Sequence, residues 1–249
     1  MKLPSLRALA TATVLTLSAA FALVFFYAPL DADQGFIQKI FYLHVPLATW
    51  ALAGFVIAAV HAIRHLRSGD AAHDARAYVS IHTSVILGVA VLLTGSIWAR
   101  ASWGKWWVWD EPTLVSFLIV FLLYCTYYPL RFAIEDRERQ ARYASVFAIT
   151  AGAFVPLNFL AVRLAESLVH PRVFATAEGG MPAKMWLTFI VALAGIGLLW
   201  VTLVRFELAA KSASARLARL RRALVAGNEP AAHGSRIAPT IPSEAGASS

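Results

Sequence analysis

The sequence predicts an all-α integral membrane protein with six transmembrane helices, both termini in the cytoplasm and a tryptophan-rich loop that faces outward. Composition is the first of three observations behind this prediction. Of the 249 residues, 59% are hydrophobic and only 14% are charged, and the mean hydropathy is +0.64. A soluble domain has about a quarter charged residues. The chain therefore has the composition of a protein that crosses the bilayer several times.

The second observation is a series of six apolar runs. A short basic segment, Met1–Arg7, precedes the first run, Ala8–Pro29. The apolar core of a signal peptide has only about 7–15 residues, so this longer run is predicted to remain as a helix. Each run can span about 30 Å of hydrocarbon as a helix, and a helix satisfies its own backbone hydrogen bonds there. The other five runs are 40–63, 78–99, 113–132, 143–163 and 185–205.

The third observation is the distribution of Lys and Arg. The N-terminus, the 64–77 and 131–142 loops and the tail from Arg205 carry 16 of these 22 residues, and the other 6 lie in or beside the alternate loops. Cytoplasmic loops carry the excess of basic residues, so both termini are predicted inside. The net charge of +8 then reflects topology and requires no nucleic-acid partner.

The sequence therefore predicts three regions: a six-helix membrane domain over 1–205, a basic cytoplasmic amphipathic helix over 206–225 and a disordered tail over 226–249. The 206–225 segment, FELAAKSASARLARLRRALV, has leucines at helical spacing with arginines between them. Such a helix can lie on the anionic inner leaflet, and a solvated helical extension is the alternative. The tail is rich in Gly, Pro, Ala and Ser, which is typical of disorder.

The loop between the third and fourth runs carries the densest motif, WGKWWVWD at Trp103–Asp110, in which four of eight residues are tryptophan. Tryptophan anchors membrane proteins at the bilayer interface, and one or two would need no other explanation. Four in seven residues favour a flat aromatic platform for a large planar ligand. In Asp110-Glu111-Pro112-Thr113, the Asp110 carboxylate is also predicted to cap the next helix, with the proline in its first turn. The candidate ligand-binding residues are Trp103, Gly104, Trp106, Trp107, Trp109 and Asp110.

Histidines are the candidate metal ligands. Of the seven, only His44 and His170 lie on the predicted outer side, beside the tryptophan loop. Haem iron takes axial histidines, and its porphyrin needs stacking and exclusion of water. The sequence lacks CxxCH and has one cysteine, Cys125, which excludes covalent c-type attachment and an internal disulfide. Four others, His61, His65, His73 and His82, lie toward the inner side, and His233 lies in the tail.

The tryptophan loop and the residues after it resemble the signature of a known family. The stretch WGKWWVWDEPT resembles the WGxWWxWD signature of the WWD group of haem-handling membrane proteins. Within that group, the six spans, the length and the two outer histidines resemble the cytochrome c maturation protein C (CcmC) family. The resemblance covers residues 1–205. Two departures are IWARAS before the motif, where a Lys-Pro pair is expected, and Glu111-Pro112, where Ala-Arg is common.

The resemblance implies a haem-binding protein of the bacterial inner membrane. Non-covalent haem b would be held at the periplasmic face by the Trp103–Asp110 motif, with His44 and His170 as axial ligands. The haem would pass to a periplasmic haem chaperone of the CcmE type for c-type cytochrome biogenesis. The implied partners in the membrane are an ABC-type complex of CcmA and CcmB types and a small CcmD-type protein.

The predicted function is therefore haem binding and transfer without enzymatic activity, since the sequence has no Walker loop or hydrolase motif. The sequence leaves two alternative functions open. A membrane b-type cytochrome in electron transfer would place histidine pairs inside the bundle. An ABC-type permease subunit would need a cytoplasmic coupling segment, for which the 131–142 loop is a weak candidate.

Overall fold

A computed structural model describes residues 4–164 and 181–228 of the chain. Within these residues, six helices are long and apolar enough to cross a membrane, which confirms the six predicted spans and the all-α class. A short 3-10 helix, η1, leads directly into the second of them. The elements are α1 (Leu6–Phe26), η1 (Phe36–Ile40), α2 (Phe41–Ser68), α3 (Ala71–Trp103), α4 (Pro112–Phe132), α5 (Arg137–Leu164) and α6 (Ala183–Asn228).

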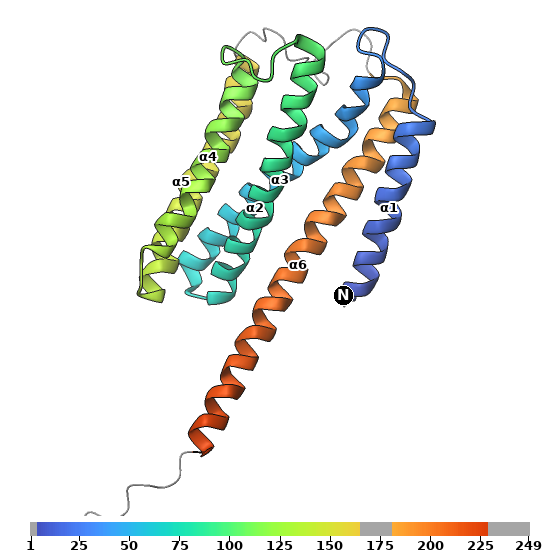
Figure 1. The fold of residues 1–249 in the computed structure, drawn as a ribbon. Helices are drawn as coiled ribbons and strands as arrows, with labels where there is room; N and C mark the ends of the chain where they lie inside the picture. Colours follow the sequence, from blue (N-terminus) through green and yellow to red (C-terminus); the bar gives the residue numbers. More distant parts are fainter. Residues whose placement is uncertain (1–3, 165–180, 229–249) are drawn as a thin grey trace, which may run out of the picture. The chain divides into compact units, whose positions relative to one another are not determined.

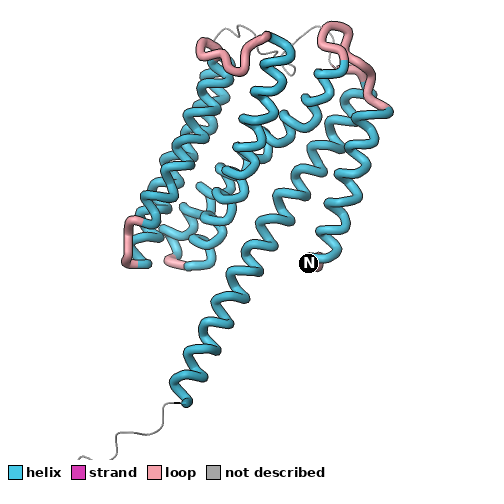
Figure 2. Tube along the Cα trace, in the orientation of Figure 1, coloured by secondary structure: helices cyan, strands magenta, loops and turns pink. Residues whose placement is uncertain are grey.

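The connections of the bundle alternate between its two ends (Figures 1 and 2). The N-terminus, the turn at 69–70 and the turn at 133–136 lie at one end. The loop over 27–35 and the tryptophan loop lie at the opposite end. Since α3 has 33 residues, it is roughly 50 Å long and exceeds the hydrocarbon thickness.

Local capping explains where α2 and α3 meet. Gly69 ends α2 in the left-handed conformation, with φ of 69°, which glycine adopts without the steric cost of a Cβ. The next residue, Asp70, begins α3, and its carboxylate accepts a hydrogen bond from the Ala72 N–H at 2.8 Å. A two-residue turn therefore suffices to reverse the chain and to place α2 and α3 side by side.

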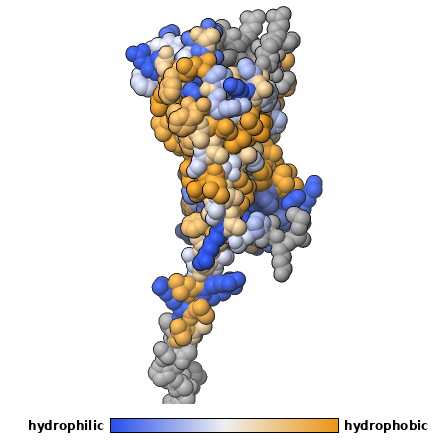
Figure 3. Space-filling model, turned by 90° about the vertical axis from the view of Figure 1, so that its right-hand side faces the viewer, coloured by the Kyte–Doolittle hydropathy of each residue, from blue (hydrophilic) through white to orange (hydrophobic). Residues whose placement is uncertain are grey.

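The core joins α2, α4 and α5 through aromatic and small residues. The rings of Phe55 and Tyr124 stack with centroids 3.8 Å apart, and the Tyr124 hydroxyl lies 3.3 Å from the carbonyl oxygens of both Phe55 and Ala148. Helices in lipid associate through close packing and interhelical hydrogen bonds because the lipid offers no hydrophobic drive. On the face of the molecule seen from the α1 side, apolar side chains gather between the two ends of the bundle (Figure 3).

Helix α6 contacts α1, α2 and α3 through polar side chains. Its Trp200 donates its indole N–H to Ser84 at 3.1 Å, and Trp50 of α2 donates to the Leu193 carbonyl at 2.9 Å. The hydroxyls of Thr13 and Thr202 lie 2.8 Å apart. These bonds satisfy polar groups that would otherwise lie unpaired in an apolar medium, and they fix the rotation of α6 about its axis.

An ion pair ties α3 to α4 near the end that holds the N-terminus. Arg131 donates two hydrogen bonds of 2.7 Å to the carboxylate of Asp74 and one of 2.9 Å to the Tyr127 hydroxyl. The two charged side chains are only 10% and 15% exposed. A paired guanidinium and carboxylate are tolerated at this depth because each satisfies the other in a bidentate geometry.

Helix α6 runs as one helix from Ala183 to Asn228. It includes the segment over 206–225 for which a basic helix is predicted. The chain divides into two compact units, of which the first ends at Leu208 and the second begins at Ala209. In the second unit Leu217, Leu220 and Leu224 are exposed. Of the tail predicted to be disordered, 226–249, the first three residues belong to α6, and 229–249 lie outside the described residues.

Candidate functional site

The tryptophan loop begins where α3 ends. Trp103 is the last residue of the helix, and Gly104 caps it with a φ of 72°. The Gly104 N–H bonds to the Arg100 carbonyl at 3.1 Å, and the Arg100 guanidinium donates back to the Gly104 carbonyl. A residue with a Cβ would be strained at this φ, so Gly104 directs the chain out of the helix and into the tryptophan loop.

The loop exposes two of its indole rings widely. Trp106 is 61% exposed and Trp109 is 71% exposed. Trp107 lies edge-on to Trp109 with centroids 5.9 Å apart, and its buried indole N–H has no hydrogen-bond partner among the described residues. Buried indole N–H groups usually find a partner. The loop therefore combines exposed flat apolar faces with an unsatisfied donor, as a site for a planar ligand with polar edges would.

The start of α4 corrects one prediction. Asp110 is not the N-cap of this helix: Glu111 holds that position, without a capping hydrogen bond from its side chain, and Pro112 is the first helical residue. The Glu111 carbonyl oxygen instead lies 3.2 Å from the N–H groups of Leu114 and Val115. Asp110 is exposed in the preceding turn, whereas Glu111 is fully buried. The proline prediction is confirmed, and the Asp110 carboxylate remains at the surface of the loop.

His44 lies in the first turns of α2, at the same end of the bundle as the tryptophan loop. Its Nδ1 is 2.9 Å from the Thr94 hydroxyl of α3, and its ring meets the edge of Trp98 at 5.8 Å between centroids. A Cβ added to Gly95 would come within 2.8 Å of the His44 Cε1 atom. The imidazole therefore packs on a groove of α3 that only glycine leaves open.

Gln34 connects the 27–35 loop to the last turns of α3. Its side-chain oxygen accepts hydrogen bonds from the Trp98 indole at 2.7 Å and from the Ser102 hydroxyl at 3.2 Å. Trp98 contacts His44, and Ser102 directly precedes Trp103. One amide thus holds the surroundings of His44 and the origin of the tryptophan loop together. No local motif marks Gln34, Thr94 or Gly95, because each acts on a residue distant in sequence.

Other histidines are engaged at the opposite end of the bundle. The Nδ1 atoms of His61 and His73 lie 3.1 Å apart. His82 contacts the Glu207 carboxylate at 2.8 Å. His44 is thus separated from these side chains, as the sequence predicts. The second predicted ligand, His170, lies outside the described residues, so its pairing with His44 stays a prediction.

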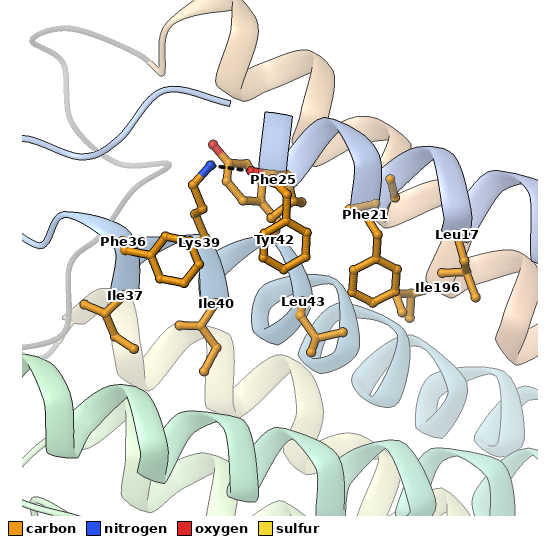
Figure 4. Close-up of a pocket in the computed structure, with 13 residues that line it drawn as sticks. Leu17, Phe21, Phe25, Phe36, Ile37, Lys39, Ile40, Tyr42, Leu43 and Ile196 are labelled. Atoms are coloured by element: carbon orange, nitrogen blue, oxygen red, sulfur yellow. Dashed lines mark hydrogen bonds between the residues drawn. The ribbon is translucent and has the colours of Figure 1, made fainter. Parts of the chain in front are cut away.

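A cavity of about 200 Å³ lies between α1, η1, α2 and α6 (Figure 4). Its lining is apolar except for Lys39 and Tyr42. The Lys39 ammonium donates to the carbonyl of Val24 in the last turn of α1, where a cation is favoured by the helix dipole, and to the carbonyl of Ala28, just past the end of that helix. Neither His44 nor any residue of the tryptophan loop lines this cavity, so we do not assign the planar ligand to it.

The residues present fit a haem at the end of the bundle that holds the tryptophan loop. Haem needs a nitrogen ligand for iron and flat apolar groups that cover the porphyrin. His44 offers an imidazole held by Thr94, and the loop offers the exposed faces of Trp106 and Trp109 with the unsatisfied Trp107 N–H. Trp103 follows Thr94 by nine residues on the same helix, about 13 Å along its axis.

Fold and site together define a six-helix membrane protein with an exposed aromatic loop and an oriented imidazole at one end. Comparison with known sequences then specifies its family. The chain belongs to the heme exporter protein C family, whose CcmC model matches residues 2–223.

Individual relatives support this membership. Heme exporter protein C of Rhodobacter capsulatus is 30% identical over 213 residues, covering 85% of this chain and 88% of the relative. The protein of that name from Paracoccus denitrificans is 31% identical over 204 residues, covering 80% and 84%. The Escherichia coli K12 protein is 32% identical over 153 residues, 60% of each chain.

Proposed function

We propose that this protein binds haem at the periplasmic face of the bacterial inner membrane and delivers it to a periplasmic haem chaperone for c-type cytochrome biogenesis. Membership in the heme exporter protein C family supports a role in haem export. The observation that carries the proposal is the co-location of the exposed tryptophans with His44 at one end of the bundle.

Each group has a distinct role in the proposed site. Haem b, bound without a covalent link, supplies an iron with two axial positions and a wide apolar plane. His44 provides one axial nitrogen, and His170 is the proposed second. Trp106 and Trp109 stack on the porphyrin and exclude water from it. Trp107 donates its indole N–H to a polar edge of the ligand, while Trp103, Gly104 and Asp110 belong to the site as the ends of the loop.

Binding of this kind suits transfer, because a non-covalent ligand at an exposed loop can leave. We propose that the acceptor is a chaperone of the CcmE type. An ABC-type complex of CcmA and CcmB types supplies the energy, with a CcmD-type membrane protein as a further partner. The protein itself acts as a binding and transfer component and not as an enzyme. The exposed leucines of the second unit are proposed to rest on the cytoplasmic leaflet.

An electron-transfer cytochrome is less well supported. Such a protein would hold haem between paired histidines inside the bundle. The two close imidazoles, His61 and His73, bond to each other at 3.1 Å between Nδ1 atoms, which leaves no room for an iron between them. His82 is held by Glu207. Neither arrangement offers the two opposed nitrogens that a buried haem requires.

Purification in detergent followed by a pyridine haemochrome assay tests the proposed function. We expect haem b to co-purify with the protein, and we expect a soluble CcmE-type acceptor to remove it on mixing. Absence of haem from the purified, folded protein would contradict the binding role. Haem that stays bound and cycles between redox states without moving to the acceptor would favour the cytochrome instead.

The orientation of the bundle is a separate prediction. In a cysteine-free Cys125→Ala background, Lys105→Cys lies in the exposed tryptophan loop and Ser68→Cys lies at the opposite end of the bundle. In intact cells whose outer membrane is permeabilised, a membrane-impermeant maleimide should label position 105 and leave position 68 unlabelled. After inner-membrane disruption both should react. Labelling of position 68 alone in intact cells would invert the topology.

A further inference from the structure

The hydrogen bond between His44 and Thr94 carries information about the imidazole itself. We propose that Thr94 holds His44 in the tautomer that bears its proton on Nδ1, so that Nε2 is the nitrogen presented to iron. Thr94 is then a positioning residue for the ligand. This inference rests on the proposed function, and it identifies which atom of His44 acts and which residue selects that atom.

The argument begins with the single proton of the Thr94 hydroxyl. Its Oγ1 lies 2.8 Å from the Ala90 carbonyl oxygen and 3.2 Å from that of Val91, one turn earlier in α3. A carbonyl oxygen only accepts hydrogen bonds, whereas a hydroxyl has one proton and two lone pairs. The hydroxyl proton is therefore directed at the backbone of α3, and a lone pair of Oγ1 remains for His44.

The 2.9 Å contact with the Nδ1 atom of His44 then has a defined direction. Since Thr94 uses its proton on the Ala90 carbonyl, Nδ1 must be the donor and must carry hydrogen. The opposite tautomer would turn the hydroxyl proton toward Nδ1. It would then leave the oxygens of Thr94 and Ala90 facing each other at 2.8 Å without a proton between them. That repulsion is unfavourable at this partly buried position.

The neighbours of Thr94 on α3 hold the ring in place. Gly95 leaves the space into which the Cε1 edge fits, and Trp98 meets the imidazole at an interplanar angle of 79°. Thr94, Gly95 and Trp98 share one face of the helix because residues three and four apart lie side by side. One helix face therefore sets both the plane of the His44 ring and its tautomer.

This arrangement predicts a measurable effect on metal binding. A hydrogen-bond acceptor on the second ring nitrogen of a ligating histidine fixes its tautomer and raises its basicity as a ligand, and losing such a partner typically weakens metal affinity by about 10- to 100-fold. Thr94→Val removes the acceptor with little change of shape. Thr94→Ser keeps the hydroxyl.

The tautomer can be measured without haem. In haem-free protein with ¹⁵N-labelled histidine in bilayers, solid-state NMR distinguishes a protonated Nδ1 from a protonated Nε2 by its ¹⁵N shifts, and His44→Asn identifies the His44 signals. We expect the Nδ1–H form in the parent and in Thr94→Ser. Thr94→Val should convert His44 to a mixture of the two forms. An Nε2–H form in the parent would overturn the assignment.

Haem titration supplies the second readout. We expect Thr94→Val to bind haem about 10- to 100-fold more weakly, with Thr94→Ser close to the parent. The matched control is Thr150→Val on α5, where the hydroxyl also bonds to the preceding turn but lies on an exposed surface. That variant should bind haem as the parent does.

The two proposals fail in different ways. If His44→Gly weakens haem binding and Thr94→Val does not, the role of Thr94 is refuted and His44 remains a ligand. If neither change alters haem binding while the Nδ1–H form is observed, the hydrogen-bond direction stands but the role of His44 toward haem is refuted. Weaker binding in both variants, with the tautomer changed in Thr94→Val, supports the proposal.

Discussion

Replacing Trp106, Trp107 and Trp109 together by alanine is expected to remove most of the haem from the purified protein while leaving its membrane insertion intact. Aromatic stacking contributes about 0.5–1.5 kcal/mol per pair beyond the area that it buries, and about 1.4 kcal/mol corresponds to a tenfold change in affinity. The loss of three rings should therefore weaken haem binding by at least roughly tenfold. Haem per molecule, from the pyridine haemochrome assay and quantitative immunoblotting, is the measurement.

A single interfacial tryptophan outside the loop provides the control. Trp186 on α6 is 40% exposed and packs edge-on against Phe189. If the loop tryptophans only anchored the protein in the interface, the triple variant would reach the membrane in smaller amounts, with unchanged haem per molecule. Trp186→Ala should leave haem per molecule unchanged. A triple variant that retains the parent's haem content would refute the aromatic platform.

Replacing His44 by glycine is expected to convert the bound iron from six-coordinate low-spin to five-coordinate high-spin. The variant removes one axial nitrogen and leaves a cavity of imidazole size beside Thr94 and Gly95. Added imidazole should enter this cavity and restore the low-spin optical spectrum. Glycine also costs roughly 1 kcal/mol in a helix interior, so recovery by imidazole separates loss of the ligand from loss of the fold. His170→Gly is expected to give the same result.

Histidines at the opposite end of the bundle are the controls for this experiment. His61→Gly removes one imidazole of the pair with His73, and His82→Gly removes the partner of Glu207. Neither change should alter the haem spectrum. A low-spin spectrum that survives the loss of both His44 and His170 without added imidazole would place the haem elsewhere.

The membrane domain could be predicted from the sequence because lipid imposes its requirement locally. Each span needs its own run of apolar residues, and each backbone polar group must be paired within its own helix. The six spans are therefore visible in composition alone, and the structure confirms them. Helix ends were harder to predict from the sequence: the N-cap of α4 is Glu111 and not Asp110. Asp is among the preferred N-cap residues and Glu is not, so residue type favours Asp110, and only the backbone conformation shows that Glu111 holds the position.

The candidate site, too, could be predicted from the sequence only in part. The sequence by itself determined that the tryptophans cluster in one loop, since four of them fall within seven residues, and that His44 belongs near the same end. Only the tertiary structure decided what surrounds His44. The contacts of His44 with Thr94 and of Gln34 with Trp98 join residues separated by 50 and 64 positions. Neither pair has a local pattern, because these contacts depend on the packing of α2 and the preceding loop against α3.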